Sequence, residues 1–284
     1  MNIIVPATRS ILASLSLMQM HPATFVPDMH FGAARVGSSG ICYGRGLFAN
    51  EHLPKHCLVS MYPVHAIGVD QADGCVELLA STSDMEHFDA VQQHEYRAYL
   101  RHAGMSKMCI DFNPNRPIVP GWAACLANDA DLCKSREPSA VESYLERSIG
   151  GANCALVPIV GCPPMMACVT LRDVAADEEL LLSYGPSYWV GGKPLDGASC
   201  SSERRQSGSA VVDADYWGRR GGERTRELLD QSSAAVLAAT SGLSPATVTH
   251  LTKGLEAALD VVWELEQAEQ QQQQQQPRQL QPFL

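Results

Sequence analysis

The sequence predicts an α+β fold, predominantly β, built of several short sheets and followed by C-terminal helices. Between residues 28 and 192, short runs of β-branched and other apolar residues are separated by turns rich in glycine and proline. Residues 222–239 and 244–270 instead carry apolar side chains at helical spacing. Strands and helices do not alternate regularly along the chain, so a parallel sheet is not expected.

Glycine turns divide the first part of the β-rich region. Residues 28–65 contain the runs FGAARVGSSGICYGRGLFA and CLVSMYPVH, which predict short strands joined by tight turns. An insertion is expected at residues 66–120. Within it, residues 83–104 have apolar positions at helical spacing and end at Gly104, so they predict a helix.

The second part of the region contains a further insertion and three predicted strands. Residues 130–150 are the expected insertion, with a short helix over SAVESYLERS. The runs ANCALVPIV and PMMACVTLRDV are apolar and rich in β-branched residues, and they flank the turn GCPP. DEELLLSYG, residues 177–185, predicts a last strand after an acidic turn.

The two ends of the chain differ from this body. Residues 1–27 hold one arginine and no acid, which predicts a flexible N-terminal tail or a transit peptide. Residues 193–221 are rich in glycine and serine and predict a linker. A helical appendage follows at 222–270, with Ser244-Pro245 as a helix start. Residues 271–284 continue a glutamine run and predict a disordered polyglutamine tail.

Composition narrows the classes of function. The net charge of -10 argues against a non-specific nucleic-acid binder and fits a basic peptide partner. No apolar run approaches the length of a membrane span, so no membrane partner is expected. The ten cysteines form no C-x-x-C pair and predict free buried thiols in a reducing compartment, rather than a disulfide framework or a zinc site. The expected location is intracellular, in the nucleus or cytoplasm.

Four short segments carry the candidate chemistry. YGRGLFA (43–49) has glycines that let backbone approach a small polar ligand. LANDA (126–130) and GANC (151–154) each present an asparagine amide, and DEELLLSYG ends in a tyrosine beside a glycine turn. Each segment alone is also explained by an ordinary turn or strand end. Their order along the chain is the informative feature.

In this order the segments resemble the motifs of the SET-domain protein methyltransferases, over residues 36–190. LRDVAADEELLLSYG matches the closing motif of that family, with Asp177 where the family usually has glycine. The resemblance implies a β-clip fold of short sheets with a pseudoknot. It also implies methyl transfer from S-adenosylmethionine to a lysine side chain of a protein or peptide, histone or non-histone.

The resemblance further implies roles for individual residues. Tyr184 would be the catalytic tyrosine, with its hydroxyl directed at the transferred methyl. The cofactor site would comprise Gly44, Arg45, Gly46, Leu47, Phe48, Asn128, Asp129, Asn153, Tyr184 and Trp189, the first five mainly through backbone groups. The substrate channel would be lined by Tyr62, Leu182 and Tyr188.

The proposed chemistry explains these residue types. The methyl of a sulfonium is already activated, so the protein supplies mainly orientation and a suitable field. The lysine amine must be neutral to attack, although its free pKa is about 10.4. A narrow apolar channel disfavours the ammonium form, and a tyrosine oxygen beside the methyl stabilises partial positive charge.

Some features depart from the family pattern. Asp129 stands where the family has histidine, and its carboxylate could accept from the adenine amino group. The two asparagine motifs lie about two dozen residues apart instead of a few, and no cysteine cluster follows Tyr184. Two alternatives therefore stay open. One is a SET-like module that binds a peptide without turnover. The other is an organelle methyltransferase with residues 1–27 as its transit peptide.

Overall fold

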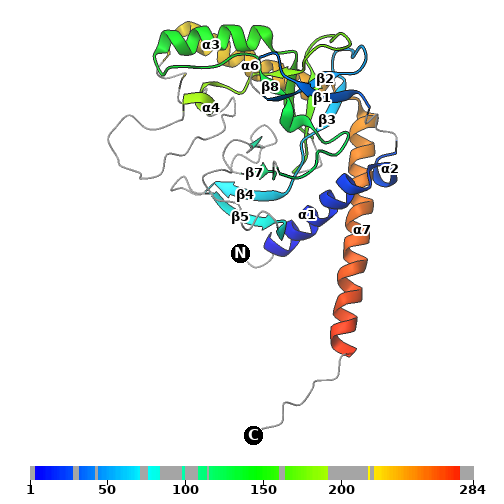
Figure 1. The fold of residues 1–284 in the computed structure, drawn as a ribbon. Helices are drawn as coiled ribbons and strands as arrows, with labels where there is room; N and C mark the ends of the chain where they lie inside the picture. Colours follow the sequence, from blue (N-terminus) through cyan, green and yellow to red (C-terminus); the bar gives the residue numbers. More distant parts are fainter. Residues whose placement is uncertain are drawn as a thin grey trace, which may run out of the picture.

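The computed structural model describes residues 4–27, 32–41, 44–70, 76–83, 98–99, 108–113, 115–159, 164–190, 217 and 221–275. Several small sheets form the body, and helices from both ends of the chain pack around it (Figure 1). The predicted fold class, α+β and predominantly β in the body, is confirmed.

The first two sheets contain the strands expected before residue 65 and after residue 152. β1 (Ala34–Ser38) and β2 (Arg45–Ala49) form an antiparallel hairpin. β3 (Leu58–Met61), β9 (Cys154–Pro158) and β10 (Met166–Thr170) form a sheet in the order β3-β10-β9. Every residue of β10 is buried, because this strand lies between two others in the main core.

A four-stranded sheet occupies the insertion expected at 66–120. Its strands are β4 (Ala66–Asp70), β5 (Val76–Ser81), β6 (Ala98–Tyr99) and β7 (Met108–Asp111), in the order β5-β4-β7-β6. Most of the helix expected at 83–104 lies outside the described residues. Residues 98–99 of that range form the strand β6, which pairs with β7, and not a helix.

The closing segment crosses the body between elements that are far apart in sequence. β8 (Asn128–Asp129) pairs in parallel with β11 (Leu181–Leu182). On the other side, the amide of Leu180 donates to the carbonyl of Leu47 in β2 at 2.7 Å. The segment therefore runs between β2 and β8, which is the crossing that the family resemblance implied.

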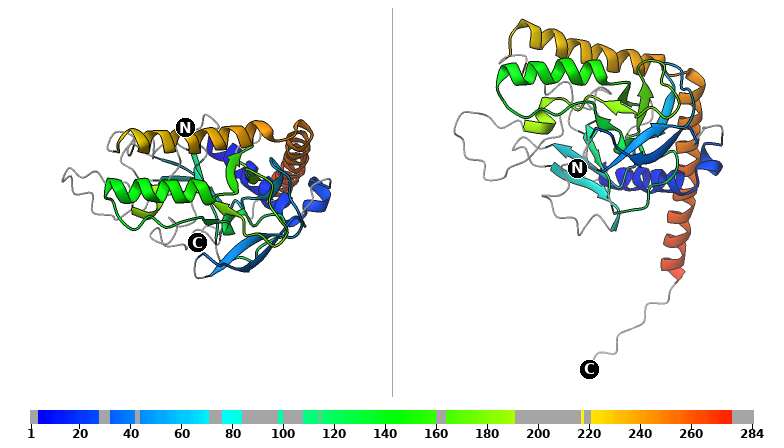
Figure 2. Two further views of the ribbon diagram at one scale, coloured as in Figure 1. Left: turned by 90° about the horizontal axis from the view of Figure 1, so that it is seen from above. Right: turned by 45° about the horizontal axis from the view of Figure 1, so that its top comes forward.

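The second insertion forms a helix that packs on the C-terminal region. α3 (Pro138–Gly151) lies beside α6 (Glu223–Gly242) in both views of Figure 2. Their buried side chains form a second hydrophobic cluster, separate from the main core. Its buried members are Cys133, Val141, Tyr144, Leu145, Trp217, Leu228 and Leu229. α4 (Pro186–Val190) packs against the same cluster through its last two residues.

Residues 4–25, for which the sequence predicted a flexible tail, form helices instead. α1 (Ile4–Met20) and α2 (Pro22–Phe25) pack on α7 (Pro245–Gln275), and α1 also contacts β5. Leu12, Leu15 and Met18 recur at intervals of three and are buried in the main core. This stripe fixes the helix, because one helical face can bury all three side chains together.

The C-terminal helices begin as expected and extend further. The amide of Thr247 donates to Ser244 Oγ at 3.0 Å, so Ser244 caps α7 ahead of Pro245. α7 continues to Gln275 and includes most of the glutamine run for which disorder was expected. The remainder of that tail, and the 193–221 linker apart from Trp217 and Gly221, lie outside the described residues.

Three further observations apply to the described part of the chain. Cys57, Cys109, Cys125, Cys133, Cys154 and Cys168 are free thiols, as the sequence predicted. No group of three or more histidine, cysteine or acidic side chains is arranged there to hold a metal ion. None of the described helices has the length and apolar character needed to cross a membrane.

Candidate functional site

Asn128 joins three of the four motif segments. Its Nδ2 donates to the carbonyl oxygen of Arg45 at 3.0 Å and to Glu179 Oε1 at 3.1 Å. Asn128 lies in β8, Arg45 begins β2, and Glu179 belongs to the closing segment. The glycine hairpin, the Asn-Asp motif and the closing motif therefore meet at one amide, although more than 130 residues of sequence separate the first from the last.

The two glycines of the hairpin have different reasons for lacking a side chain. A Cβ at Gly46 would lie 2.4 Å from Glu179 Oε1, so this backbone can approach the closing segment only without one. Gly44 has a φ of 129°, and no atom of the described residues lies within 4 Å of the position of a Cβ, so this side of Gly44 faces open space there. The side chain of Leu47 is buried in the core, and its carbonyl accepts the amide of Leu180. Phe48 lies under the guanidinium of Arg35.

Asn153 fixes the chain crossing. Its Nδ2 donates to Glu178 Oε1 at 3.0 Å and to the carbonyl of Glu179 at 2.8 Å, and its Oδ1 accepts from the amide of Leu181 at 2.8 Å. The residue is fully buried. Both amide donors are thus used within the protein, and Asn153 holds the closing segment against the start of β9.

Glu178 is the acidic residue that binds Asn153 at this crossing. Partial burial raises its pKa, but hydrogen bonds from Arg172, Asn153 and the amide of Ala175, and the charge of Arg172, lower the pKa of Glu178 to about 2. Arg172 Nη2 lies 2.7 Å from Glu178 Oε1. The carboxylate therefore stays ionised across the neutral and mildly acidic range.

Tyr184 projects from the turn that follows β11. Gly185 has a φ of 87°, which allows the turn expected directly after this tyrosine. The hydroxyl of Tyr184 donates to the carbonyl of Ala127 at 2.7 Å. The ring lies edge-on to Tyr188, with centroids 4.6 Å apart, and stacks at 6.3 Å on Trp189. Three predicted site residues thus form one aromatic group.

Tyr62 lies beside this group. It is almost fully buried, and burial raises the pKa of Tyr62 well above its ordinary value, with further increases from Cys125, Asp111, Tyr184 and Tyr188. The ring of Tyr62 lies edge-on to Phe112, with centroids 5.9 Å apart. Leu182, the remaining predicted channel residue, is buried in the same core cluster as Tyr62. Tyr62 and Leu182 are therefore core residues and Tyr184 packs against the core, and surroundings of such low polarity disfavour a charged amine.

Asp129 accepts five hydrogen bonds from the protein. Ser148 Oγ at 2.6 Å and the amide of Asp131 at 3.3 Å donate to Oδ1. The Tyr144 hydroxyl at 2.5 Å, Trp189 Nε1 at 2.7 Å and the amide of Tyr184 at 3.2 Å donate to Oδ2. A carboxylate offers about four acceptor positions. These donors therefore occupy the acceptor positions of Asp129, and the hydrogen bond expected from an adenine amino group finds no free position there.

Burial raises the pKa of Asp129, and the hydrogen bonds from Ser148, Tyr144 and Trp189 partly offset this effect. The net direction is upward. A buried carboxylate needs such donors, since leaving a charge unpaired in the interior costs several kcal/mol. The donor set explains how aspartate is tolerated at a position where the resemblance implied histidine.

Three residues of the site were missed from the sequence. Glu179 binds Asn128 through Oε1 and the amide of Gly40 through Oε2 at 3.1 Å. Tyr144 and Ser148 reach Asp129 from α3. Tyr144 and Ser148 are four apart and share one helical face, but a face that carries one tyrosine and one serine gives no sign that it binds a carboxylate.

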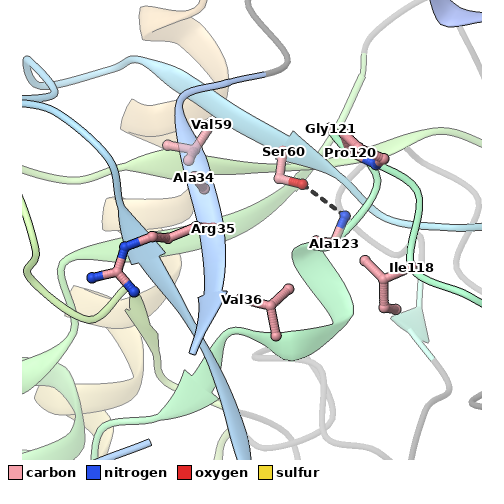
Figure 3. A pocket seen from close by; sticks show the side chains of 9 residues that line it. All are labelled: Ala34, Arg35, Val36, Val59, Ser60, Ile118, Pro120, Gly121 and Ala123. Carbon is pink, nitrogen blue, oxygen red and sulfur yellow. Dashed lines mark hydrogen bonds between the residues drawn. The ribbon is translucent and has the colours of Figure 1, made fainter. Parts of the chain in front are cut away.

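A separate cavity of about 180 Å³ lies between β1 and β3 (Figure 3). Its walls are mainly apolar, and the amide of Ala123 donates to Ser60 Oγ at 2.8 Å on one side. The lining residues are Ala34, Arg35, Val36, Val59, Ser60, Ile118, Pro120, Gly121 and Ala123. None of the predicted site residues is among them, so this cavity is distinct from the candidate site.

Comparison with known proteins agrees with this geometry. The model of the SET domain matches residues 44–185, half of the chain, and this span contains all four motif segments except Tyr43. No curated protein matches the chain in sequence.

Two solved structures are similar to this chain at 14% identity. One is a putative histone methyltransferase of Plasmodium falciparum, with a TM-score of 0.28 over 55% of this chain and 96% of that chain. The other is ATXR5 in complex with a mono-methylated histone H3.1, with a TM-score of 0.34 over 62% of this chain and 68% of that chain. The match to the domain model carries the assignment.

Proposed function

Because the chain belongs to the SET-domain family, we propose that it transfers a methyl group from S-adenosylmethionine to a lysine side chain of a protein or peptide. One observation carries the proposal. Asn128 binds the carbonyl of Arg45 in the glycine hairpin, and the preceding residue, Ala127, accepts the hydroxyl of Tyr184. The proposed cofactor groups and the proposed catalytic tyrosine therefore meet at two consecutive residues.

The residues present fit the cofactor. The backbone from Gly44 to Phe48 borders open space at Gly44, where a polar ligand could approach. Within the described residues, Asn128 Oδ1 accepts no hydrogen bond, so it can accept one from the ammonium of the methionine moiety. When bound, S-adenosylmethionine supplies an activated methyl on a sulfonium. Trp189 stacks on Tyr184 and donates to Asp129. Asp129 and Asn153 would contribute indirectly, because both bind the backbone of the closing segment.

The aromatic group would act on the lysine. Tyr62, Tyr184 and Tyr188 would line the lysine channel, and low polarity there would favour the neutral amine over the ammonium. The Tyr184 hydroxyl is held in place by the carbonyl of Ala127, so its oxygen is fixed before substrate arrives. Such preorganisation is the main contribution that a protein makes to displacement at an activated carbon.

The charge of the chain supports a basic substrate. A net charge of -10 attracts lysine-rich segments, whether of a histone or of another protein. The described cysteines are free thiols, which fits a reducing compartment such as the nucleus or cytoplasm. The departure at Asp129 and the polyglutamine tail favour the non-catalytic peptide-binding alternative slightly, and the five donors to Asp129 give that departure a structural reason compatible with activity.

Calorimetry and a transfer assay test the proposal. We expect S-adenosylmethionine to bind wild type, and Asn128→Ala to weaken binding at least about tenfold, or 1.4 kcal/mol. Asn50→Ala is the matched control, because the one described hydrogen bond of the Asn50 side chain goes to the exposed carbonyl of Gly32, away from the candidate site. Tyr184→Phe should retain binding and lose transfer to a lysine-rich protein. Binding without any transfer by wild type would favour the peptide-binding module, and no binding by folded wild type would overturn the proposal.

A further inference from the structure

We propose that Tyr144, on the inserted helix α3, is a positioning residue that holds Tyr184 in its orientation for methyl transfer. The inference rests on the proposed function. Tyr144 acts on the backbone that carries Tyr184.

Tyr144 and Asp129 bind two consecutive amides. The Tyr144 hydroxyl donates to Asp129 Oδ2 at 2.5 Å and accepts from the amide of Gly185 at 3.0 Å. The same Asp129 Oδ2 accepts from the amide of Tyr184 at 3.2 Å. The backbone on both sides of the Tyr184–Gly185 peptide bond is therefore fixed by one phenol and one carboxylate.

This position needs such support. Gly185 adopts a left-handed conformation, and glycine has more freedom to leave its conformation than any other residue. If the turn relaxed, the Tyr184 ring would swing away from Ala127. Productive methyl transfer requires reacting groups to be held within about 0.5 Å. Tyr144 and Asp129 together form a clamp, which supplies the restraint that Gly185 lacks.

Tyr144 is itself held by the second hydrophobic cluster. Its side chain is 0% exposed and packs with residues of α3 and α6. Arg224 Nε lies 3.1 Å from Glu146 Oε1, and Thr225 Oγ1 lies 3.3 Å from Glu142 Oε2, so α6 is also tied to α3 by polar contacts. Helix α6 thus supports the candidate site without contributing a residue to it.

The clamp also links two departures from the family pattern. The first departure is Asp129, which needs hydrogen-bond donors when buried. The second is the longer segment between the two asparagine motifs, which forms helix α3 and provides Tyr144 and Ser148 as those donors. One departure would be costly without the other. We therefore expect the aspartate and the helix to act as a unit.

Tyr144→Phe tests the inference, because it removes only the hydroxyl. Val141→Ala is the matched control: Val141 is fully buried in the same helix and cluster and makes no hydrogen bond to Asp129. We expect Tyr144→Phe to lower kcat by roughly 10- to 100-fold and to leave the KM for S-adenosylmethionine within about twofold. Val141→Ala should lower thermal stability at least as much and keep kcat near the wild-type value.

The possible outcomes separate the two proposals. Transfer by wild type with an unchanged kcat in Tyr144→Phe would overturn the positioning role alone. An equal fall of kcat in Val141→Ala would also overturn it, since any damage to the cluster would then suffice. If folded wild type binds S-adenosylmethionine but transfers no methyl, the proposed function fails first and the positioning role fails with it.

Discussion

Asn153 and Glu178 are joined by a hydrogen bond of 3.0 Å between Asn153 Nδ2 and Glu178 Oε1. Arg172 donates to the same oxygen at 2.7 Å, and the amide of Ala175 donates to Oε2 at 3.0 Å. The bond connects the second asparagine motif to the closing motif. It secures the crossing on which the candidate site is built.

Glu178→Gln should therefore destabilise the fold in a pH-dependent manner. The pKa of Glu178 falls from an ordinary value of 4.5 to about 2 in the folded protein. Its contribution is complete above the unfolded pKa and is lost as pH falls through the folded pKa. After allowance for solvent screening, we expect a loss of about 1–2 kcal/mol at pH 7. Urea unfolding at pH 7 and at pH values below 4.5 measures the difference between wild type and variant.

The difference should narrow as pH falls from 4.5 toward 2. Glu256→Gln, on the exposed face of α7, is the control and should change stability by less than about 0.5 kcal/mol. Equal stability of wild type and Glu178→Gln at pH 7 would show that the crossing does not depend on this carboxylate.

Asp177 occupies a position that favours glycine. Its φ is 64°, in the left-handed region, and the family motif usually has glycine there. Replacing it with alanine should cost about 1 kcal/mol, because alanine gains no local hydrogen bond in this conformation. Asp177→Gly should be more stable than Asp177→Ala by about 1 kcal/mol, because glycine adopts this conformation without strain. Both variants lose the exposed ion pair with Arg35, so that loss does not affect their order. Thermal unfolding of both variants measures the order, and a more stable alanine variant would contradict it.

The body and the order of its motifs could be predicted because they depend on local patterns. The turns at Gly44 and Gly185, the strands around Asn153 and the cap at Ser244 are each encoded within a few neighbouring residues. The crossing could be predicted only from the family resemblance, which indicates how segments far apart in the sequence lie together.

The partners of Asp129 could not be predicted in this way. Tyr144 and Ser148 lie 15 and 19 residues from it along the chain, and only tertiary packing brings them together. Helix α1 was missed for another reason. The composition of residues 1–27, with one charged side chain, led to the prediction of a tail. The spacing of Leu12, Leu15 and Met18 is a helical signal that could have identified α1.

Gly46→Ala should weaken cofactor binding more than it weakens the fold. The added Cβ would lie 2.4 Å from Glu179 Oε1 and 3.2 Å from Asn128 Nδ2, so the carboxylate must move and its bond to Asn128 is lost. We expect binding of S-adenosylmethionine to fall at least about tenfold, with a stability loss of about 1 kcal/mol. Calorimetry and urea unfolding measure the two effects.

Gly40→Ala serves as the control for that variant. Gly40 also contacts Glu179, through its amide, but a Cβ there would lie 3.9 Å from the nearest carboxylate oxygen, Glu179 Oε2, which is an ordinary contact. Binding in this control should match wild type. A similar loss in both variants would mean that stiffening the hairpin, rather than moving Glu179, weakens the site.

Leu15→Ala tests whether the N-terminal helix belongs to the fold. Leu15 is 0% exposed and lies in the main core with residues of α7. Removing a buried leucine side chain costs about 2–5 kcal/mol, because the cavity is filled only partly. Met20→Ala, on the same helix at 61% exposure, should change stability by less than about 0.5 kcal/mol. Removal of residues 1–27 should be worse than either, since it would uncover the face of α7 on which α1 and α2 pack. Limited proteolysis of the three proteins measures this, and a shortened chain as resistant as wild type would restore the tail or transit-peptide interpretation.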